Sequence, residues 1–264
     1  MKITIFTSNN LRHNYLINSI SQIAKQVNVI QECNTIFPGE IKSFYSQSST
    51  MQKYFKNVIN SQKKIFGTQV LNFKSKEVKL LSLKYGDLNH CSLNFLKDFL
   101  KSDIYLVFGS SYIKGSLVKF LIKNKAINIH MGISPYYRGS NCNFWALYDH
   151  RPDLVGATIH YLTDGLDDGK ILYHAISEQV SDPYLYSMST VKSAIYSLTK
   201  KIKEKSLFNL RSCKQNISLE LRYSLNKQFN DNVAINFMKR KKFKNKKFNF
   251  KLFKDYFLLK ERQF

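Results

Sequence analysis

The chain has 264 residues, of which 44% are hydrophobic, and its 41 basic and 18 acidic side chains give a formal net charge of +23. This length and apolar content can bury a sizeable core, which excludes a disordered chain and fits one domain with at most a small appendage. The positive charge is compatible with a polyanionic partner and, equally, with lysine that fills tolerant surface positions.

The first half of the chain alternates between strand and helix patterns. Runs of β-branched and apolar residues predict strands over 2–6, 27–30, 104–108 and 126–130. Apolar residues at helical spacing predict a helix that carries Leu16, Ile20 and Ile23 and further helices over 41–66, 93–100 and 113–122. The segment 67–89 shows neither pattern, and Gly109 with the two serines that follow predicts a turn.

The second half continues the alternation. Further strands are predicted over 155–162 and 171–180. Asp182 and Pro183 suit the cap and the first position of a helix, and apolar residues recur at helical spacing over 185–202. Such alternation is typical of a parallel sheet that is covered on both faces. We therefore predict an α/β fold with a Rossmann-like, mostly parallel sheet and helices on both faces.

The composition changes after about residue 200, where lysine, asparagine and phenylalanine become abundant. The densest basic run, from Lys239 to Lys254, also contains aromatic residues, and this combination can stack bases while it neutralises phosphates. A basic surface helix whose aromatic residues dock on the core has the same composition. We divide the chain into an α/β domain over 1–206 and a basic C-terminal extension over 207–264 that packs on the same domain.

Cysteine usage and hydropathy indicate the compartment. The four cysteines are widely spaced and form neither a Cys-x-x-Cys pair nor a cluster with histidine at metal-ligand spacing. The apolar run at the N-terminus is too short for a signal peptide, and no later run approaches the ~18 apolar residues of a transmembrane helix. We expect a cytoplasmic protein without a transmembrane segment and without a metal.

Two polar residues end one of the predicted strands. Asn128 and His130 are two residues apart, so their side chains point to the same side of the strand. In isolation this pair is more often structural, but a turn with a cation follows at 134–139, and an acidic loop with glycines follows at 163–169. Because sites in parallel sheets lie at the carboxyl ends of the strands, we expect these residues to meet there with the turn 110–113. An amide, an imidazole and a carboxylate suit the transfer of a group onto an amine.

Three motifs in this order resemble the folate-dependent formyltransferases, which include glycinamide ribonucleotide transformylase, methionyl-tRNA formyltransferase and the N-formyltransferases of nucleotide-linked amino sugars. The matching elements are N-I-H at 128–130, S-P-Y-Y-R-G at 134–139 and G-A-T-I-H-Y-L-T-D-G-L-D-D-G at 156–169. The strand and turn V-F-G-S-S-Y-I at 107–113 also fit, and the match is strong over 104–174. The resemblance implies a formyltransferase fold, with the catalytic domain over 1–206.

By this resemblance the catalytic residues are Asn128, His130 and Asp167. Asp168 stands where relatives often carry a small residue, so either carboxylate remains a candidate for the acting group. The implied donor is 10-formyltetrahydrofolate, and no metal is needed. The Asn128 amide and a His130 N–H would stabilise the oxyanion, while the carboxylate orients His130 and helps to move the proton.

The resemblance also implies a slot for the folate pterin between the turn after 104–108 and the acidic loop. The residues implied at this slot are Val107, Tyr112, Ile113, Ala126, Leu162, Asp164, Gly165 and Leu166. Most of these contacts would come from the backbone, so the side chains carry little signature of their own.

The acceptor is predicted from the loop after the first strand and from the turn 134–139. The loop 7–13 lacks the glycines expected of a ribonucleotide transformylase, which leaves Arg12 and His13 as contacts to a charged acceptor. The turn offers two aromatic rings and a cation that could stack a sugar or base and pair with a phosphate: Tyr136, Tyr137 and Arg138. A nucleotide-linked amino sugar is therefore the predicted acceptor, and a homodimer is a possible assembly.

Two alternatives remain from the sequence. A methionyl-tRNA formyltransferase-like enzyme is expected to carry a C-terminal β-barrel, and the stretch after Lys200 shows little alternating pattern for one. A nucleic-acid-binding protein with a vestigial pocket would use the basic C-terminal run instead. Nucleic-acid binding is the less favoured prediction, because all three types of catalytic side chain are retained together.

Overall fold

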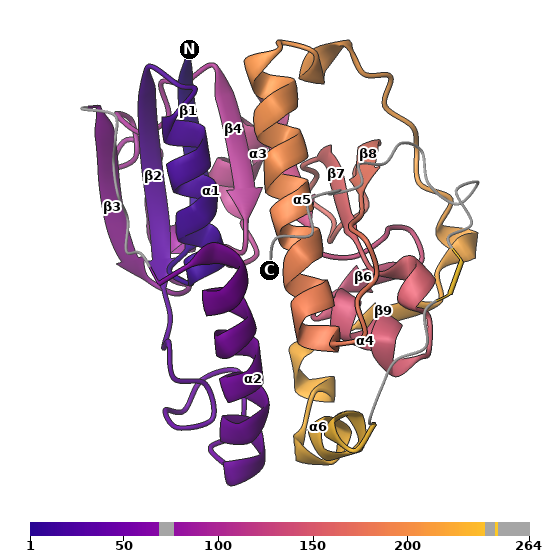
Figure 1. The fold of residues 1–264 in the computed structure, drawn as a ribbon. Helices are drawn as coiled ribbons and strands as arrows, with labels where there is room; N and C mark the ends of the chain where they lie inside the picture. The colour runs from indigo at the N-terminus through magenta and orange to yellow at the C-terminus, as the bar shows by residue number, and fades with distance from the viewer. Residues whose placement is uncertain (69–76, 241–245, 248–264) are drawn as a thin grey trace.

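The computed structural model describes residues 1–68, 77–240 and 246–247. At its centre lies a seven-stranded sheet (Figure 1). Its strands are β1 (Lys2–Ser8), β2 (Gln26–Cys33), β3 (Val78–Lys84), β4 (Ile104–Phe108), β5 (Ile127–His130), β7 (Ala157–Tyr161) and β8 (Ile171–Ala175). Their order is β3-β2-β1-β4-β5-β7-β8, in which β1 to β5 run parallel and the β5–β7 and β7–β8 pairs are antiparallel. The predicted mostly parallel α/β fold is confirmed.

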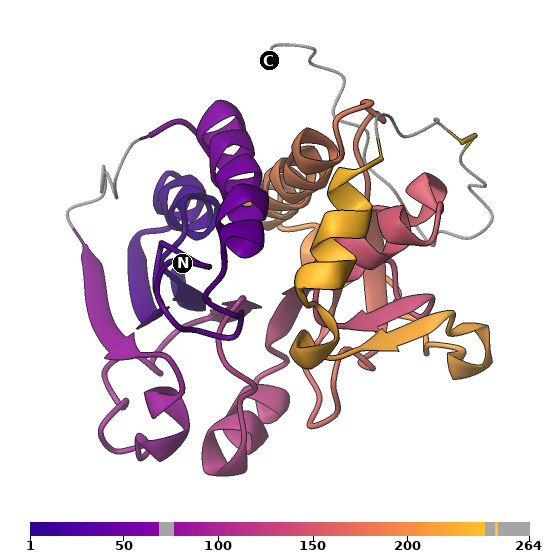
Figure 2. The same cartoon turned by 90° about the horizontal axis from the view of Figure 1, so that it is seen from below.

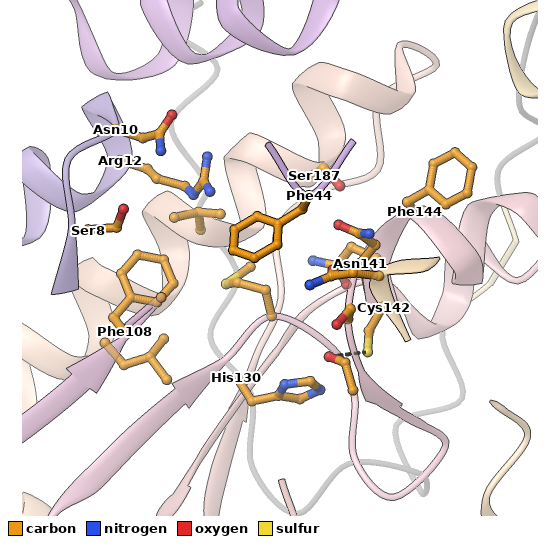
Figure 3. A pocket seen from close by; sticks show the side chains of 18 of the residues that line it. Ser8, Asn10, Arg12, Phe44, Phe108, His130, Asn141, Cys142, Phe144 and Ser187 are labelled. Atoms are coloured by element: carbon orange, nitrogen blue, oxygen red, sulfur yellow. Dashed lines mark hydrogen bonds between the residues drawn. The ribbon is translucent and has the colours of Figure 1, made fainter. Parts of the chain in front are cut away.

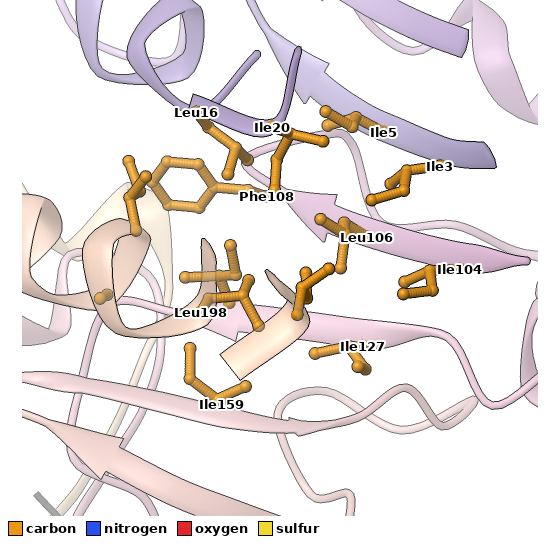
Figure 4. Packing of buried hydrophobic residues seen from close by; sticks show 14 of the residues in the cluster. Ile3, Ile5, Leu16, Ile20, Ile104, Leu106, Phe108, Ile127, Ile159 and Leu198 are labelled. Carbon is orange, nitrogen blue, oxygen red and sulfur yellow. The ribbon is translucent and has the colours of Figure 1, made fainter. Parts of the chain in front are cut away.

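Helices cover both faces of the sheet. The helices are α1 (Leu11–Ser21), α2 (Ser49–Phe66), α3 (Gly115–Lys123), α4 (Cys142–Tyr148), α5 (Pro183–Lys203) and α6 (Asp231–Met238). On one face α1 and α5 pack against the apolar side chains of β1, β4 and β5, as Figure 4 shows for Ile5, Leu106 and Ile127. On the other face α3 and the segment 88–100 form a second core with Phe6. Because both faces are covered, β4 is buried along its whole length, as its continuous apolar run predicted.

A third apolar cluster lies beyond the carboxyl edge of the sheet. It is formed by α2, α4 and α6, which meet around Tyr54, Phe144 and Phe237. Figure 2 shows α2 and α6 side by side at this end of the molecule. The three helices enclose the space in front of the strand ends, where the polar residues of the predicted site are found.

The described part of the C-terminal extension packs on the α/β body. Its strand β9 (Arg222–Ser224) pairs in parallel with β6 (Tyr137–Gly139), and α6 buries Ala234 and Phe237 in the third cluster. Short 3-10 helices complete the segment at Leu207–Asn209, Ile217–Leu219 and Asn226–Gln228. Of the basic run from Lys239 to Lys254, residues 241–245 and 248–254 lie outside the described residues, so its predicted role stays a prediction.

Some element boundaries differ from the prediction. The helix predicted over 41–66 begins only at Ser49, because the Ser48 side chain accepts a hydrogen bond from the Met51 N–H and caps it there. The helix predicted over 93–100 is a series of turns in the structure, although Leu96 is buried. The segment 67–89 contains β3 and a 3-10 helix at Asp87–His90.

Further differences lie near the second half of the sheet and in the extension. The strand predicted over 171–180 ends at Ala175, and β9 and α6 were not predicted. None of the helices in the described part of the chain is both long and apolar enough to span a bilayer.

The central strand offers a test of this architecture. Ile5 on β1 is 0% exposed and packs in the core under α1, so Ile5→Ala is expected to lower the free energy of unfolding by about 2–5 kcal/mol. The control Leu80→Ala lies on the edge strand β3, where Leu80 is 40% exposed, and is expected to cost less than about 1 kcal/mol. Urea denaturation followed by circular dichroism measures both values, and equal losses would contradict the assigned core.

Candidate active site

A cavity of about 890 Å³ opens at the carboxyl edge of the sheet. The ends of β1, β4, β5 and β7 line it at the sheet. Its other lining comes from α2, α4, α5, the start of α1, the turn 109–113 and the loop 162–167. Figure 3 shows Arg12 and Asn10 on one side of this cavity and Asn141 and Cys142 across from them. The position agrees with the general rule that open α/β sheets bind ligands outside the carboxyl ends of their strands.

Asn128, His130 and Asp167 come together at the floor of the cavity, as the sequence predicted. The Asp167 Oδ2 atom lies 3.2 Å from His130 Nδ1, and the Asn128 amide Nδ2 donates to Asp167 Oδ1 at 3.2 Å. The other ring nitrogen of His130, Nε2, lies 3.1 Å from the Tyr137 carbonyl oxygen. The first two residues come from β5 and the third from the loop after β7, so the contact joins segments about forty residues apart in the chain.

The acidic loop is shaped to present Asp167. This residue has a left-handed backbone conformation with φ of 53°, and its carbonyl oxygen accepts a hydrogen bond from Gln215 Nε2 at 2.8 Å. The Gly139 N–H donates to its carboxylate at 3.2 Å. A side chain at Gly169 would place its Cβ 1.8 Å from the Tyr161 carbonyl oxygen, which explains the glycine that closes the motif.

The structure separates the two candidate carboxylates. Asp168 turns away from His130, and its Oδ1 accepts a hydrogen bond from the Thr163 hydroxyl. Asp167 is the carboxylate that contacts both Asn128 and His130.

His160 is a fourth member of the site that the sequence reasoning missed. The pairing of β5 with β7 places it opposite Asn128, and its Nε2 lies 3.0 Å from the Asn128 amide nitrogen and 3.8 Å from Asp167 Oδ1. Its Nδ1 lies 2.9 Å from the Tyr161 carbonyl oxygen, so Nδ1 carries a proton, and Nε2 is the atom that faces the Asn128 amide. In the sequence, His160 could have been found from its position within the motif at 156–169, two residues after Thr158.

The electrostatics of the site make His130 a cation beside Asp167. Burial by itself lowers the pKa of His130, but the neighbouring Asp167 carboxylate outweighs burial and holds this pKa well above its ordinary value. Burial raises the pKa of Asp167, whereas the contacts with His130 and His160 lower it, and the net result lies far below the usual range of a carboxyl. At neutral pH the pair is therefore an imidazolium and a carboxylate.

Most residues predicted for the folate slot line the cavity. These are Val107, Tyr112, Ile113, Leu162, Gly165 and Leu166. Ala126 and Asp164 are not among the lining residues. Their carbonyl oxygens accept within the protein, that of Ala126 from the Leu162 N–H at 2.7 Å and that of Asp164 from the Tyr112 hydroxyl. The turn after β4 and the acidic loop thus face each other across one end of the cavity.

The residues predicted for the acceptor separate into two groups. Arg12 and His13 line the cavity. Burial lowers the pKa of His13 well below its ordinary value, and the nearby Arg12 cation lowers it further, so His13 is neutral. Its Nδ1 accepts from the Asn10 N–H at 3.3 Å, which leaves the proton on Nε2.

The second group, from the turn 134–139, lies outside the cavity lining. The Tyr137 side chain is 1% exposed and donates to Asp149 at 3.2 Å. Arg138 pairs with Glu220 at 2.9 Å and donates to the Leu166 carbonyl oxygen at 2.8 Å, so it supports the acidic loop from behind. Tyr136 packs against the third apolar cluster. These three residues therefore have structural contacts in place of the predicted stacking.

One side of the cavity is lined by a wall of aromatic rings, which the sequence analysis did not predict. Its rings come from segments far apart in the chain and line the cavity opposite the strand ends: Tyr45, Tyr54, Phe55, Phe144, Tyr184, Phe229 and Phe237. Asn141 lies at its edge, where Oδ1 accepts from the Tyr45 hydroxyl at 3.3 Å and the buried Nδ2 has no partner among the described residues. Among the described residues, no group of three or more His, Cys, Asp or Glu side chains could hold a metal ion.

A family model described as formyl transferase matches residues 98–194, the segment that contains all three motifs. This segment belongs to the formyl transferase family. The chain therefore carries a formyltransferase domain, and the recognition made from the motifs is confirmed. A comparison with curated protein sequences found no match.

Solved structures of formyltransferases share the fold. A sugar N-formyltransferase from Shewanella sp FDAARGOS_354 superposes with a TM-score of 0.52 at 18% identity, over 87% of this chain and 78% of that one. A phosphoribosylglycinamide formyltransferase from Anaplasma phagocytophilum gives a TM-score of 0.50 at 17% identity, over 80% and 89% of the two chains. A glycinamide ribonucleotide transformylase from Symbiobacterium toebii gives 0.51 at 14% identity, over 82% and 94%. At such identities the likeness establishes the fold.

The ion pair of this formyltransferase domain predicts a pH-dependent stability. The raised pKa of His130 contributes stability that is complete below the unfolded value of about 6.5 and is lost as the pH rises through the folded value. The lowered pKa of Asp167 contributes stability present above about 3.9 and lost as the pH falls through the folded value. Asp167→Asn is expected to cost about 3–5 kcal/mol, most of all between about pH 4 and 6.5, with a smaller loss at higher pH.

Chemical denaturation across this pH range measures the difference between wild type and variant. The matched control is Asp168→Asn next to it, for which a loss below about 1 kcal/mol is expected because Thr163 offers it only a neutral partner. A difference between wild type and Asp167→Asn that does not change with pH would show that the ion pair does not contribute as assigned.

Proposed function

We propose that the chain transfers the formyl group of 10-formyltetrahydrofolate onto the primary amine of a nucleotide-linked amino sugar. The observation that carries this proposal is the contact of Asn128, His130 and Asp167 at the floor of a cavity of about 890 Å³. The family match of residues 98–194 supports the reaction class. The turn and acidic loop at one end of the cavity supply the donor slot, and Arg12 with the aromatic wall supplies the acceptor site.

The chemistry follows from the charges of the site. The neutral amine attacks the formyl carbon, a C–N bond forms, and the carbonyl oxygen becomes an oxyanion. The His130 imidazolium stabilises this oxyanion as a charged donor, which is stronger than a neutral one. The bond from carbon to the folate nitrogen then breaks, and water carries the proton of the amine to the departing nitrogen, while the Asp167 carboxylate keeps His130 protonated and oriented.

The hydrogen bonds of the catalytic residues must partly exchange during this reaction. The His130 Nε2 proton is directed at the Tyr137 carbonyl oxygen, and the Asn128 Nδ2 hydrogens are directed at His160 and Asp167. A formyl oxygen can take over one donor from each side chain, because a developing oxyanion is a stronger acceptor than a carbonyl. His160 keeps the Asn128 amide oriented while this exchange takes place.

The acceptor assignment rests on Arg12 and on the wall across from it. The Arg12 guanidinium is charged at neutral pH, and none of the described acidic side chains forms an ion pair with it. It stands near the start of α1, where the helix N-terminus also favours an anion such as a phosphate group. The aromatic rings on the opposite wall can stack a base or sugar face.

The proposal is tested by transfer from 10-formyltetrahydrofolate, measured as tetrahydrofolate release with a panel of amine acceptors. The panel contains nucleotide-linked 3-amino and 4-amino sugars, glycinamide ribonucleotide and methionyl-tRNA. Turnover with one of the sugars supports the proposed acceptor. Turnover with the ribonucleotide or the tRNA alone would replace this acceptor while keeping the donor, and absence of both turnover and folate binding would contradict the proposed function.

The catalytic residues give a first prediction for the activity. Asn128→Ala is expected to lower kcat/KM by about 10²–10³, because one donor to the oxyanion is removed, and His130→Asn is expected to lower it at least as much. The control Asn209→Ala removes an exposed amide away from the cavity and should leave kcat/KM unchanged. Steady-state kinetics at saturating donor measures these values, and full activity of Asn128→Ala would remove it from the catalytic set.

Arg12 gives a second prediction. Arg12→Ala is expected to raise the KM for an anionic acceptor about 10-fold to 100-fold, the range of a lost charge-assisted hydrogen bond, with little change in the KM for the donor. Arg211→Ala, an exposed arginine that does not line the cavity, controls for the loss of one positive charge. An unchanged acceptor KM in Arg12→Ala would show that the acceptor binds elsewhere in the cavity.

A further inference from the structure

A buried carboxylate outside the cavity lining stands at the carboxyl end of β2. Glu32 is 0% exposed, and within the described chain no basic side chain forms an ion pair with it. A charge this deep in the protein is tolerated only where hydrogen bonds replace its lost hydration. The partners of Glu32 therefore indicate which segments it fixes.

Within the described chain, the hydrogen bonds to Glu32 come from two segments, the turn after β3 with the 3-10 helix that follows it and the turn after β4. The N–H and the hydroxyl of Ser111 donate to its two oxygens at 2.6 and 2.9 Å. The N–H groups of Gly86 and Leu88 donate to Oε1 at 2.8 and 3.4 Å. One carboxylate thus ties the turn after β4 to the turn after β3, and both to the end of β2.

Asn89 adds a second tie from the same segment to the same turn. Its side-chain amide donates to the Tyr112 carbonyl oxygen at 3.0 Å and accepts from the Lys114 N–H at 2.8 Å. A longer contact of 3.4 Å runs to the Ser111 hydroxyl. Residues 110–114 have no helix or strand of their own, so Glu32 and Asn89 supply the partners that a regular element would provide.

The tied turn forms one wall of the cavity. Ser111, Tyr112 and Ile113 line it, and the Tyr112 hydroxyl reaches the Asp164 carbonyl oxygen on the opposite wall. We propose that Glu32 and Asn89 are positioning residues that hold the turn 110–114 in the shape that binds the folate donor. This inference rests on the proposed function, because that function assigns the donor to the slot between the turn and the acidic loop.

Glu32→Gln replaces the carboxylate by an amide of the same size and so disturbs the hydrogen bonds to the turn after β4 without leaving a cavity. Each oxygen of Glu32 accepts from at least one backbone N–H among its described partners, so in either orientation the NH2 group of Glu32→Gln must face an N–H group. The turn can relieve this contact only by moving. Asn89→Ala removes the second tie from an exposed position, where loss of the side chain leaves the core intact.

The test combines donor binding with exchange of the turn amides. For Glu32→Gln and Asn89→Ala we expect the Kd for tetrahydrofolate and the KM for the formyl donor to rise about tenfold, which corresponds to about 1.4 kcal/mol. The acceptor KM and the kcat at saturating donor should stay within about threefold of wild type. Hydrogen–deuterium exchange of the peptide that covers 109–114 should become faster in both variants.

Two controls separate positioning from general stability. Asn94→Ala removes an exposed amide from the neighbouring turns, and Thr4→Val removes a buried hydroxyl bond at the opposite end of the sheet. Neither should change donor affinity or the exchange of 109–114, even if Thr4→Val lowers the Tm. A donor KM that rises equally in Thr4→Val would reduce the Glu32 effect to stability and overturn the proposal.

The outcomes also separate this proposal from the function on which it rests. If the wild type binds no tetrahydrofolate, the proposed function is wrong. Amide exchange of 109–114 still tests the structural claim in that case, and unchanged exchange in both variants would show that Glu32 and Asn89 do not hold the turn. If the wild type binds tetrahydrofolate and Asn89→Ala binds it equally well, the positioning role of the tie is wrong and the proposed function stands.

Discussion

The contact between His130 and Asp167 is the constraint around which the rest of the site is arranged. Each charge would be costly to bury alone, so the pair is stable only while both are present and hydrogen-bonded. Gly139 donates to the carboxylate and the Tyr137 carbonyl oxygen accepts from the imidazolium. The turn at 134–139 and the acidic loop must therefore meet at the end of β5, which makes the site a product of three segments at once.

The two kinds of strand pairing have different roles in this arrangement. The antiparallel pairing of β5 with β7 sets Asn128 opposite His160 and brings the acidic loop within reach. The parallel strands β1, β2 and β4 end at the same edge and present the turns that line the cavity. Two polar networks result, one around Asp167 at the floor of the cavity and one around Glu32 behind the turn 110–114. Each consists of a buried carboxylate that accepts hydrogen bonds from segments remote in the chain.

The C-terminal extension is part of the site and not only an appendage to it. Gln215 donates to the carbonyl oxygens of Asp167 and Gly169, and Glu220 pairs with Arg138 behind the acidic loop. Phe229 and Phe237 belong to the aromatic wall of the cavity. Loss of residues 207–240 would therefore remove supports of the acidic loop together with one side of the proposed acceptor site.

The sequence by itself determined the alternating α/β fold and the residues at the centre of the site. Continuous apolar runs such as Ile104–Phe108 identify buried parallel strands locally, and the motifs at 128–130 and 156–169 carry Asn128, His130 and Asp167 in the chain itself. Tertiary structure decided whether Asp167 or Asp168 faces the imidazole, because that depends on a left-handed residue and on a hydrogen bond from Gln215.

Tertiary structure also decided which aromatic side chains line the cavity. Tyr137 and Arg138 are residue types that often bind ligands. In the structure, however, Tyr137 donates a hydrogen bond to Asp149, and Arg138 forms an ion pair with Glu220, which is remote in the sequence. The aromatic wall and the four hydrogen bonds to Glu32 join segments from across the chain. The spacing of residues within one segment of the sequence does not predict such contacts. Local propensity therefore predicts elements and motifs, whereas the partner of each buried polar group is fixed only when distant segments pack together.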